Sequence, residues 1–213
     1  MPDAPDTPYV LELGAVFTLL FVTLGPLKVL GPFAQYTRDA DETKMKQIAM
    51  RAFVIALIAV VAGGFLGRAL ARGWDVSVPT LELAGGIIFF LVGLGLVLEQ
   101  YKPPATAPPT LPAEPMAAAM RIAFPSVVTS YGIAALIVLL SNSRGHGRTA
   151  AIVGLVLAIM VLNLLAMLYA RRIMGGAVVV GMQILGAVLG VLQVGLALEM
   201  MLRGLRDLGV LRA

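Results

Sequence analysis

The sequence predicts an all-α, polytopic membrane protein with six transmembrane helices in two inverted three-helix repeats. Composition is the first reason, because 59% of the residues are hydrophobic, only 13% are charged and the mean hydropathy is +0.93. Soluble domains are typically about 45 to 50% apolar and about 25% charged. Long apolar segments separated by short polar connections are the second reason, and a pattern shared by the two halves is the third. These features exclude a soluble globular domain.

Six apolar segments are long enough to form transmembrane helices, since a hydrocarbon core about 30 Å thick needs about 20 helical residues. The connections are mostly short and charged, but a proline-rich stretch over about 99–119 is longer. Such a stretch predicts an extended or disordered linker. The chain would then be one membrane domain, 1–213, with a first repeat over about 11–98 and a second over about 120–202. The expected spans are 11–35, 48–70, 79–98, 120–140, 149–170 and 178–202.

The first span is interrupted by two Gly-Pro pairs, Gly25-Pro26 and Gly31-Pro32, with Lys28 between them. A proline removes a backbone donor and clashes with the preceding turn. The carbonyls freed in this way need a donor that hydrocarbon does not offer, so such a break survives only against other protein or a wet cavity. We therefore expect helix breaks at both pairs.

Small residues mark faces of the second and sixth spans, where Gly63 stands with Gly67 and Gly186 with Gly190. This spacing lets helices approach closely. The faces could serve contacts within one chain, a homo-oligomer, or a partner in a larger membrane complex, and the pattern leaves these uses open.

The third span begins after Ser77 and Pro79, and Glu82 falls in its first turn. A serine before a helix is a favourable N-cap, and the helix dipole stabilises a carboxylate there. Glu82 is therefore interpreted as a helix-end residue rather than a substrate ligand. Asn163, Gln183 and Gln193 in the last two spans are interpreted first as polar packing contacts between helices.

Polar residues near the two expected breaks are the candidate substrate-binding side chains. Lys28 could bind a substrate or counter-ion, because a charge inside the membrane is costly and usually functional. It could also extend to the headgroups, as long lysine side chains do. Thr129 and Ser130, followed by Tyr131, could supply hydroxyls to a substrate. They could equally bind carbonyls freed by Pro125 in the fourth span or bond across helices.

The two halves share a pattern at a nearly constant offset. Gly95-Leu96-Val97-Leu98-Glu99 matches Gly195-Leu196-Ala197-Leu198-Glu199 at an offset of 100, and Pro26 matches Pro125 at an offset of 99. Each half has an odd number of spans, so the second would be inverted relative to the first. Inverted repeats with helix breaks at corresponding places indicate a transporter whose site lies near the bilayer midplane. Pro26 and Pro125 would mark that site.

Catalytic and metal chemistry finds no support in the residues. The chain has no cysteine and a single histidine, His146, so a histidine- or thiolate-based metal site is not expected. We expect no catalytic residues, no metal and no cofactor. The net charge of +4 is explained by basic loops that orient a membrane protein and predicts no nucleic-acid partner.

Several stretches resemble the MarC family of six-helix inner-membrane proteins, some members of which are described as neutral amino acid transporters. The resemblance lies in the break from Pro26 to Phe33, in Val78 to Ile88, in Ala123 to Ala134, and in Gly175-Gly176. It implies the six-helix fold and a transport role. Pro26 and Pro125 match the family's two breaks, whereas Lys28 and Thr129-Ser130-Tyr131 stand where typical members have other residues.

Two functions are therefore expected from the sequence. The first is a secondary transporter or exporter of small amino acids or similar small polar solutes, embedded in the lipid bilayer. The alternative is a non-transporting membrane scaffold or accessory subunit of a larger membrane complex. The resemblance implies the bacterial inner (plasma) membrane. The basic flank that follows the first span favours an outside N-terminus, and six spans would then place the C-terminus outside as well.

Overall fold

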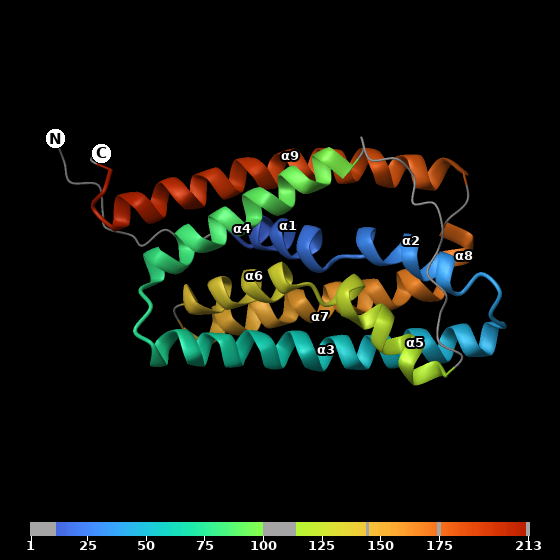
Figure 1. The fold of residues 1–213 in the computed structure, drawn as a ribbon. Coiled ribbons are helices and arrows are strands. Elements are labelled where there is room, and N and C mark those ends of the chain that lie inside the picture. Colours follow the sequence, from blue (N-terminus) through green and yellow to red (C-terminus); the bar gives the residue numbers. More distant parts are fainter. Residues whose placement is uncertain (1–11, 100–113, 144, 174–175, 212–213) are drawn as a thin grey trace.

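The computed structural model describes residues 12–99, 114–143, 145–173 and 176–211, so that most of the expected linker lies outside the described residues. Within these ranges the regular structure is entirely helical (Figure 1). Five helices are long and apolar enough to cross a membrane, and counting a bent pair as one span gives six. The prediction of an all-α membrane protein is confirmed, with five to six spans.

The first span consists of α1 (Leu13–Leu24) and α2 (Leu27–Tyr36), which are separated at Gly25-Pro26 as expected. The second expected break is wrong, because α2 continues through Gly31 and Pro32 to its end. The proline ring normally clashes with the Cβ of the preceding residue. Gly31 has no Cβ, so this clash is absent at Pro32 and the helix continues at the loss of one backbone hydrogen bond. Gly25 removes the same clash at Pro26, so the preceding residue does not account for the difference between the two pairs.

The fourth expected span is the bent pair. It contains α5 (Pro115–Arg121), the wider helical turn η1 (Ile122–Val127) and α6 (Ser130–Ser141). The span is bent by 59° between its two parts. The chain becomes extended at Phe124, with φ −120° and ψ 126°, immediately before Pro125. The predicted break at Pro125 is thus present. The helix begins at Pro115, inside the stretch expected to be linker, because proline suits a first helical position and the following Met-Ala-Ala-Ala-Met run favours helix.

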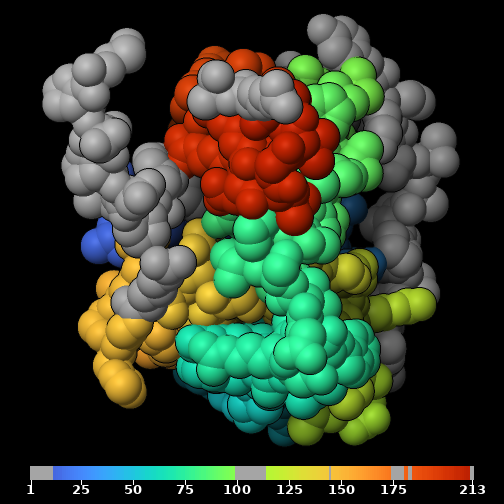
Figure 2. Space-filling model, turned by 90° about the vertical axis from the view of Figure 1, so that its left-hand side faces the viewer, coloured from blue at the N-terminus to red at the C-terminus, as the bar shows by residue number. Residues whose placement is uncertain are grey.

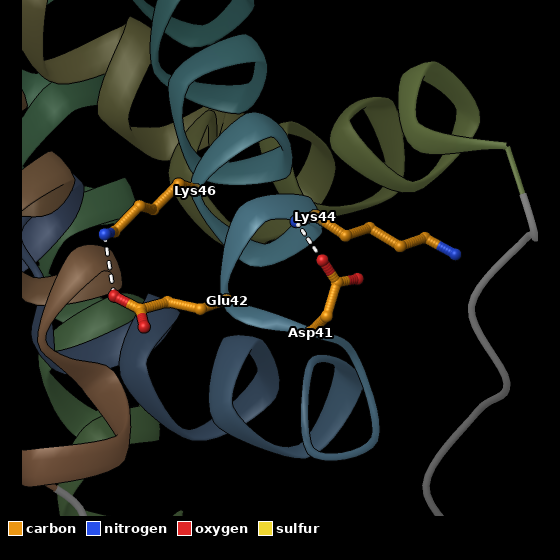
Figure 3. Close-up of polar contacts among 4 residues, drawn as sticks. All are labelled: Asp41, Glu42, Lys44 and Lys46. Atoms are coloured by element: carbon orange, nitrogen blue, oxygen red, sulfur yellow. Dashed lines mark hydrogen bonds and ion pairs between the residues drawn. The ribbon is translucent and has the colours of Figure 1, made fainter.

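The remaining helices match the other expected spans but extend further. They are α3 (Glu42–Gly73), α4 (Val78–Glu99), α7 (His146–Leu168), the short α8 (Ala170–Ile173) and α9 (Gly176–Asp207). Polar turns account for the extra length of α3, as Figure 3 shows at its start. There the Asp41 side chain accepts from the Lys44 backbone N–H at 3.3 Å, and exposed Lys46 pairs with Glu42 at 2.7 Å.

Two groups of helices lie against the broken segments (Figure 1). The long helices α4 and α9 run beside each other on one side, and α3, α6 and α7 lie on the other side of α1 and α2. An end-on view shows the end of α9, the start of α4, the end of α3 and the α6–α7 turn together at one end of the bundle (Figure 2). The first break, at the buried Gly25 and Pro26, therefore lies inside the bundle, and the second lies at the start of α6.

Glycines allow the closest helix contacts. Gly63 and Gly67 of α3 face the side chains of Ile133 and Ile137 on α6, and Gly190 of α9 faces α4. In contrast, a Cβ added at Gly186 would meet no atom of the chain within 4 Å. Three of the four glycines expected at close contacts therefore pack within the chain. Because lipid is as apolar as these helices, such van der Waals packing matters more here than the hydrophobic effect.

Candidate functional site

The two helix breaks contact each other directly. The Oγ1 of Thr129 donates to the carbonyl oxygen of Thr23 at 3.0 Å and accepts from the backbone N–H of Gly132 at 3.0 Å. One buried hydroxyl thus donates a hydrogen bond to a carbonyl at the end of α1 and caps the start of α6. Of the roles open to Thr129 from the sequence, the bond to Thr23 corresponds to a bond across helices, because this carbonyl belongs to α1 and is not one freed by Pro125.

The end of α1 also receives a donor from α7. Nδ2 of Asn163 donates to the carbonyl oxygen of Leu24 at 2.6 Å and to that of Ile159 at 3.0 Å. In an unbroken helix the Leu24 carbonyl would accept from residue 28, which here belongs to the next helix. Asn163 is 1% exposed, and it replaces the backbone donor that the break removes.

Lys28 is directed toward the second break. Its Nζ lies 2.5 Å from the Tyr131 hydroxyl oxygen and 4.1 Å from the centre of the Tyr131 ring. Each residue belongs to the first turn of a half-helix, Lys28 in α2 and Tyr131 in α6. The half-buried ammonium group is therefore at the junction of the two breaks, and this position does not correspond to extension toward the headgroups.

The other sequence-predicted residues are placed differently. Gly25 and Pro26 are buried at the first break, whereas Pro125 and Ser130 are exposed on the outer side of the second. Gly31 and Pro32 are half-buried within α2 and form no break. The structure thus brings Pro26, Lys28 and Thr129 together and leaves the remaining candidates outside this cluster. The side chain of Gln183 lies outside the described residues.

Sequence reasoning missed the partners of the breaks. The sequence indicates Tyr131 as a hydroxyl source and Asn163 as a packing residue first and a pathway residue second. The available signal was their polarity within apolar segments, but nothing in the local sequence assigns Asn163 to a carbonyl that is 139 residues away in the chain.

Glu82 is engaged at a helix end, in agreement with its sequence interpretation. Its Oε1 accepts from Nδ2 of Asn142, the residue that follows α6, at 2.5 Å. The Ser77 hydroxyl accepts from the Thr80 backbone N–H at 3.3 Å, as expected for a residue that caps α4. Over the part of the chain that the structure describes, no group of three or more histidine or acidic side chains is placed to hold a metal ion.

Comparison with known proteins identifies the family. The model of the MarC family of integral membrane proteins matches residues 11–208. The chain belongs to the MarC family.

Curated relatives agree with this membership of the MarC family. The UPF0056 membrane protein MJ1677 of Methanocaldococcus jannaschii is 21% identical over 192 residues, which cover 89% of this chain and 94% of the relative. The UPF0056 inner membrane protein YhgN of Escherichia coli is 26% identical over 198 residues, covering 92% and 96%. No solved structure matches the chain. The protein is thus an integral membrane protein similar over nearly its whole length to these relatives.

Proposed function

We propose that this MarC protein is a secondary transporter or exporter of small amino acids or similar small polar solutes, with its site at the paired breaks near the bilayer midplane. The observation that carries the proposal is the contact between Lys28 and Tyr131, one from the first turn of each half-helix. The N-terminal end of a helix is the positive end of its dipole and attracts anionic groups. The ammonium group of Lys28 adds a full charge at the same place.

The proposal includes an inverted repeat, which is supported by residues that contact their own counterparts. In such a repeat, a residue near the two-fold axis lies next to the equivalent residue of the other half. Lys28 and Tyr131 are 103 positions apart, and Phe89, whose carbonyl accepts from Gln193 at 3.2 Å, is 104 positions before that glutamine. Two separate contacts share almost one offset, which is three to five positions larger than the 99 to 100 of the sequence pattern, so in this register the counterpart of Lys28 is Tyr131 and Pro26 is no longer paired with Pro125.

The packing of α4 against α9 adds support for the repeat. A Cβ added at Gly86 would lie 2.9 Å from the carbonyl oxygen of Ala197, and one added at Gly93 would lie 3.0 Å from that of Gly190. At an offset of 104, the counterpart of Gly86 is Gly190 and the counterpart of Ala197 is Gly93. The first contact is therefore converted into the second, and the second into the first. An exchange of this kind is expected of a two-fold axis that passes between the helices.

A small solute with a carboxylate fits this arrangement chemically. Its negative charge would lie between the ammonium group of Lys28 and the first turns of α2 and α6, while the Tyr131 hydroxyl offers a further hydrogen bond. Rocking of one half against the other would open the site to each side in turn. Inorganic cations would be disfavoured at this position by the charge of Lys28.

Flux through proteoliposomes tests the proposal. Purified protein is reconstituted, and uptake and efflux of labelled glycine, alanine, serine and threonine are compared with protein-free vesicles. We expect saturable flux of at least one solute, reduced by about tenfold or more in Lys28→Met, because one charge-assisted contact is lost. Lys46→Met is the matched control, since Lys46 is exposed and paired with Glu42 at the start of α3.

Two results would contradict the proposal. Equal flux in Lys28→Met and in the unchanged protein would show that the substrate site does not lie at the breaks. Absence of flux for every solute in both directions would remove the transport function and favour the scaffold or accessory-subunit alternative. That alternative predicts stoichiometric co-purification with other membrane proteins from mild detergent.

A further inference from the structure

The end of α1 collects backbone oxygen atoms in a buried, apolar part of the bundle. The helix stops at Leu24 and restarts at Leu27, so the carbonyls of Thr23 and Leu24 lose their partners from the next helical turn. Their donors are instead the neutral side chains of Thr129 and Asn163. A helix C-terminus is the negative end of the helix dipole, so the end of α1 favours a cation, in contrast to the starts of α2 and α6.

A second observation at the same place is the amide oxygen of Asn163. Nδ2 of this residue donates to Leu24 and Ile159, but Oδ1 is fully buried and has no hydrogen-bond partner among the residues that the structure describes. Buried polar atoms are almost always satisfied, so an orphaned one in a native structure calls for a ligand, an ion or a water molecule. The oxygen lies on the same amide group that contacts the Leu24 carbonyl.

We propose that the carbonyl oxygens of Thr23 and Leu24, the hydroxyl oxygen of Thr129 and Oδ1 of Asn163 form a binding site for Na⁺. Ion binding requires a half-turn of the planar amide, which brings Oδ1 toward the Leu24 carbonyl and gives up the Nδ2 bonds to Leu24 and Ile159, so that the ion takes the place of Nδ2 at Leu24. Two such oxygens repel each other unless a cation lies between them. The Thr129 hydroxyl has two lone pairs, so it accepts from Gly132 with one and can bind the ion with the other.

The donor set selects the class of cation. All the proposed ligands are neutral oxygen atoms, which suit a hard monovalent ion. Ca²⁺ and Mg²⁺ sites are usually built with carboxylates, and none of these residues supplies one. Transition metals favour imidazole or thiolate ligands, which are also missing from the set. Lys28 is the charged residue of the same break, and its ammonium group is directed to Tyr131 of α6.

Direct binding of ²²Na⁺ to the purified, detergent-solubilised full chain tests the site. We expect saturable binding that unlabelled NaCl displaces and that KCl or choline chloride at equal concentration does not. Asn163→Leu and Thr129→Val should each weaken the affinity by about tenfold or more through the loss of one ligand. Asn163→Asp keeps an oxygen ligand and adds a negative charge, so binding should be retained or strengthened.

The chain provides a matched control for the loss of a buried amide. Gln193 is also fully buried, donates from Nε2 to the Phe89 carbonyl and has an orphaned Oε1, but its partner lies within the unbroken helix α4. Gln193→Leu should therefore leave Na⁺ binding within about twofold of the unchanged protein. Size-exclusion profiles establish that each variant is folded.

Three outcomes would overturn the site: no saturable Na⁺ binding by the unchanged chain, equal losses in Asn163→Leu and Gln193→Leu, or no binding by a folded Asn163→Asp. A water molecule in place of the ion would give the first outcome. The inference goes beyond the proposed transport function and is measured without flux. Transport without Na⁺ binding would contradict the Na⁺ site but not the transport function. Na⁺ binding without transport would contradict the transport function but not the Na⁺ site.

Discussion

Gly25 is the residue at which the break depends most directly on the absence of a side chain. Its backbone is extended, and a Cβ added there would overlap the carbonyl group of Phe21, which accepts the Gly25 N–H at 2.8 Å. The requirement is therefore for space. Any other residue must separate Gly25 from α1 and thereby disturb the carbonyls that Thr129 and Asn163 bind.

Gly25→Ala should destabilise the protein by about 1–3 kcal/mol, the usual effect of overpacking. Gly154→Ala in α7 is the matched control, because a Cβ there meets no atom within 4 Å and alanine favours a helix by about 0.5–1 kcal/mol over glycine. Thermal unfolding in detergent, followed by circular dichroism, measures both variants. Equal melting temperatures for the two would show that the predicted overlap is relieved without cost.

Lys28 should oppose the proposed Na⁺ site, since like charges repel across a short, poorly screened distance. Lys28→Met is therefore expected to tighten ²²Na⁺ binding by about tenfold while it reduces solute flux. Lys46→Met serves again as the control and should change neither quantity. Unchanged Na⁺ affinity in Lys28→Met would mean that the ammonium group and the ion do not interact.

Proline chemistry identified the positions of the two main breaks from the sequence, but the partners of the breaks were not accessible to it. Pro26 and Pro125 act through their own backbone, which is a local property. The bonds from Thr129 to Thr23 and from Asn163 to Leu24 join residues 106 and 139 positions apart. Their formation depends on how α6 and α7 are placed against α1, and local patterns do not specify that placement.

At the scale of elements, the sequence predicted spans better than it predicted ends. The apolar core of each span is set by the membrane thickness, whereas the ends depend on caps. Asp41 starts α3 well before its apolar stretch, and Pro115 starts α5 within a proline-rich stretch.

The end of α2 is fastened to the other half of the chain by Arg171 of α8. Its guanidinium group donates to the Thr37 carbonyl at 2.6 Å and also to the Ala40 carbonyl. These carbonyls lie at and just after the C-terminus of α2, where cationic side chains are favoured. The α2–α3 connection is therefore ordered by a residue that lies far away in the sequence.

Arg171→Gln should accelerate amide hydrogen exchange in the last turn of α2 and the following connection by about tenfold, because charge-assisted bonds to those carbonyls are lost. Arg172→Gln removes the same charge from the same short helix without touching these bonds, and it should have little effect. Exchange is followed by mass spectrometry of the detergent-solubilised chain. Equal acceleration in both variants would assign the effect to net charge.

At the scale of the molecule, the expected orientation places the α2–α3 connection inside the cell and the α3–α4 connection outside. The absence of cysteine makes this easy to test, because single cysteines can be introduced into the natural sequence. Arg72→Cys, at the exposed end of α3, should react with a membrane-impermeant maleimide in intact cells, whereas Asp39→Cys should react only after permeabilisation. The reverse pattern would mean an inside N-terminus.

The membrane fold as a whole follows from composition and from the lengths of the apolar segments, which is why the sequence could predict it. The site depends on a smaller set of facts. Lys28 was identified because an intramembrane charge is conspicuous, and Thr129 because it follows Pro125. The role of Asn163 became visible only when the structure showed one end of its amide bonded and the other end buried and orphaned.

The contact between Lys28 and Tyr131 has a consequence for how such a chain can evolve. Under the proposed duplication, these residues occupy equivalent places on the axis, and two identical subunits would have to present the same side chain twice. Two lysines there would repel each other, and two tyrosines would leave the site without a charge. Fusion of the two halves into one polypeptide removes this restriction, because each copy can then mutate alone. A mixed pair on the axis is an arrangement that a homodimer of half-sized chains cannot encode.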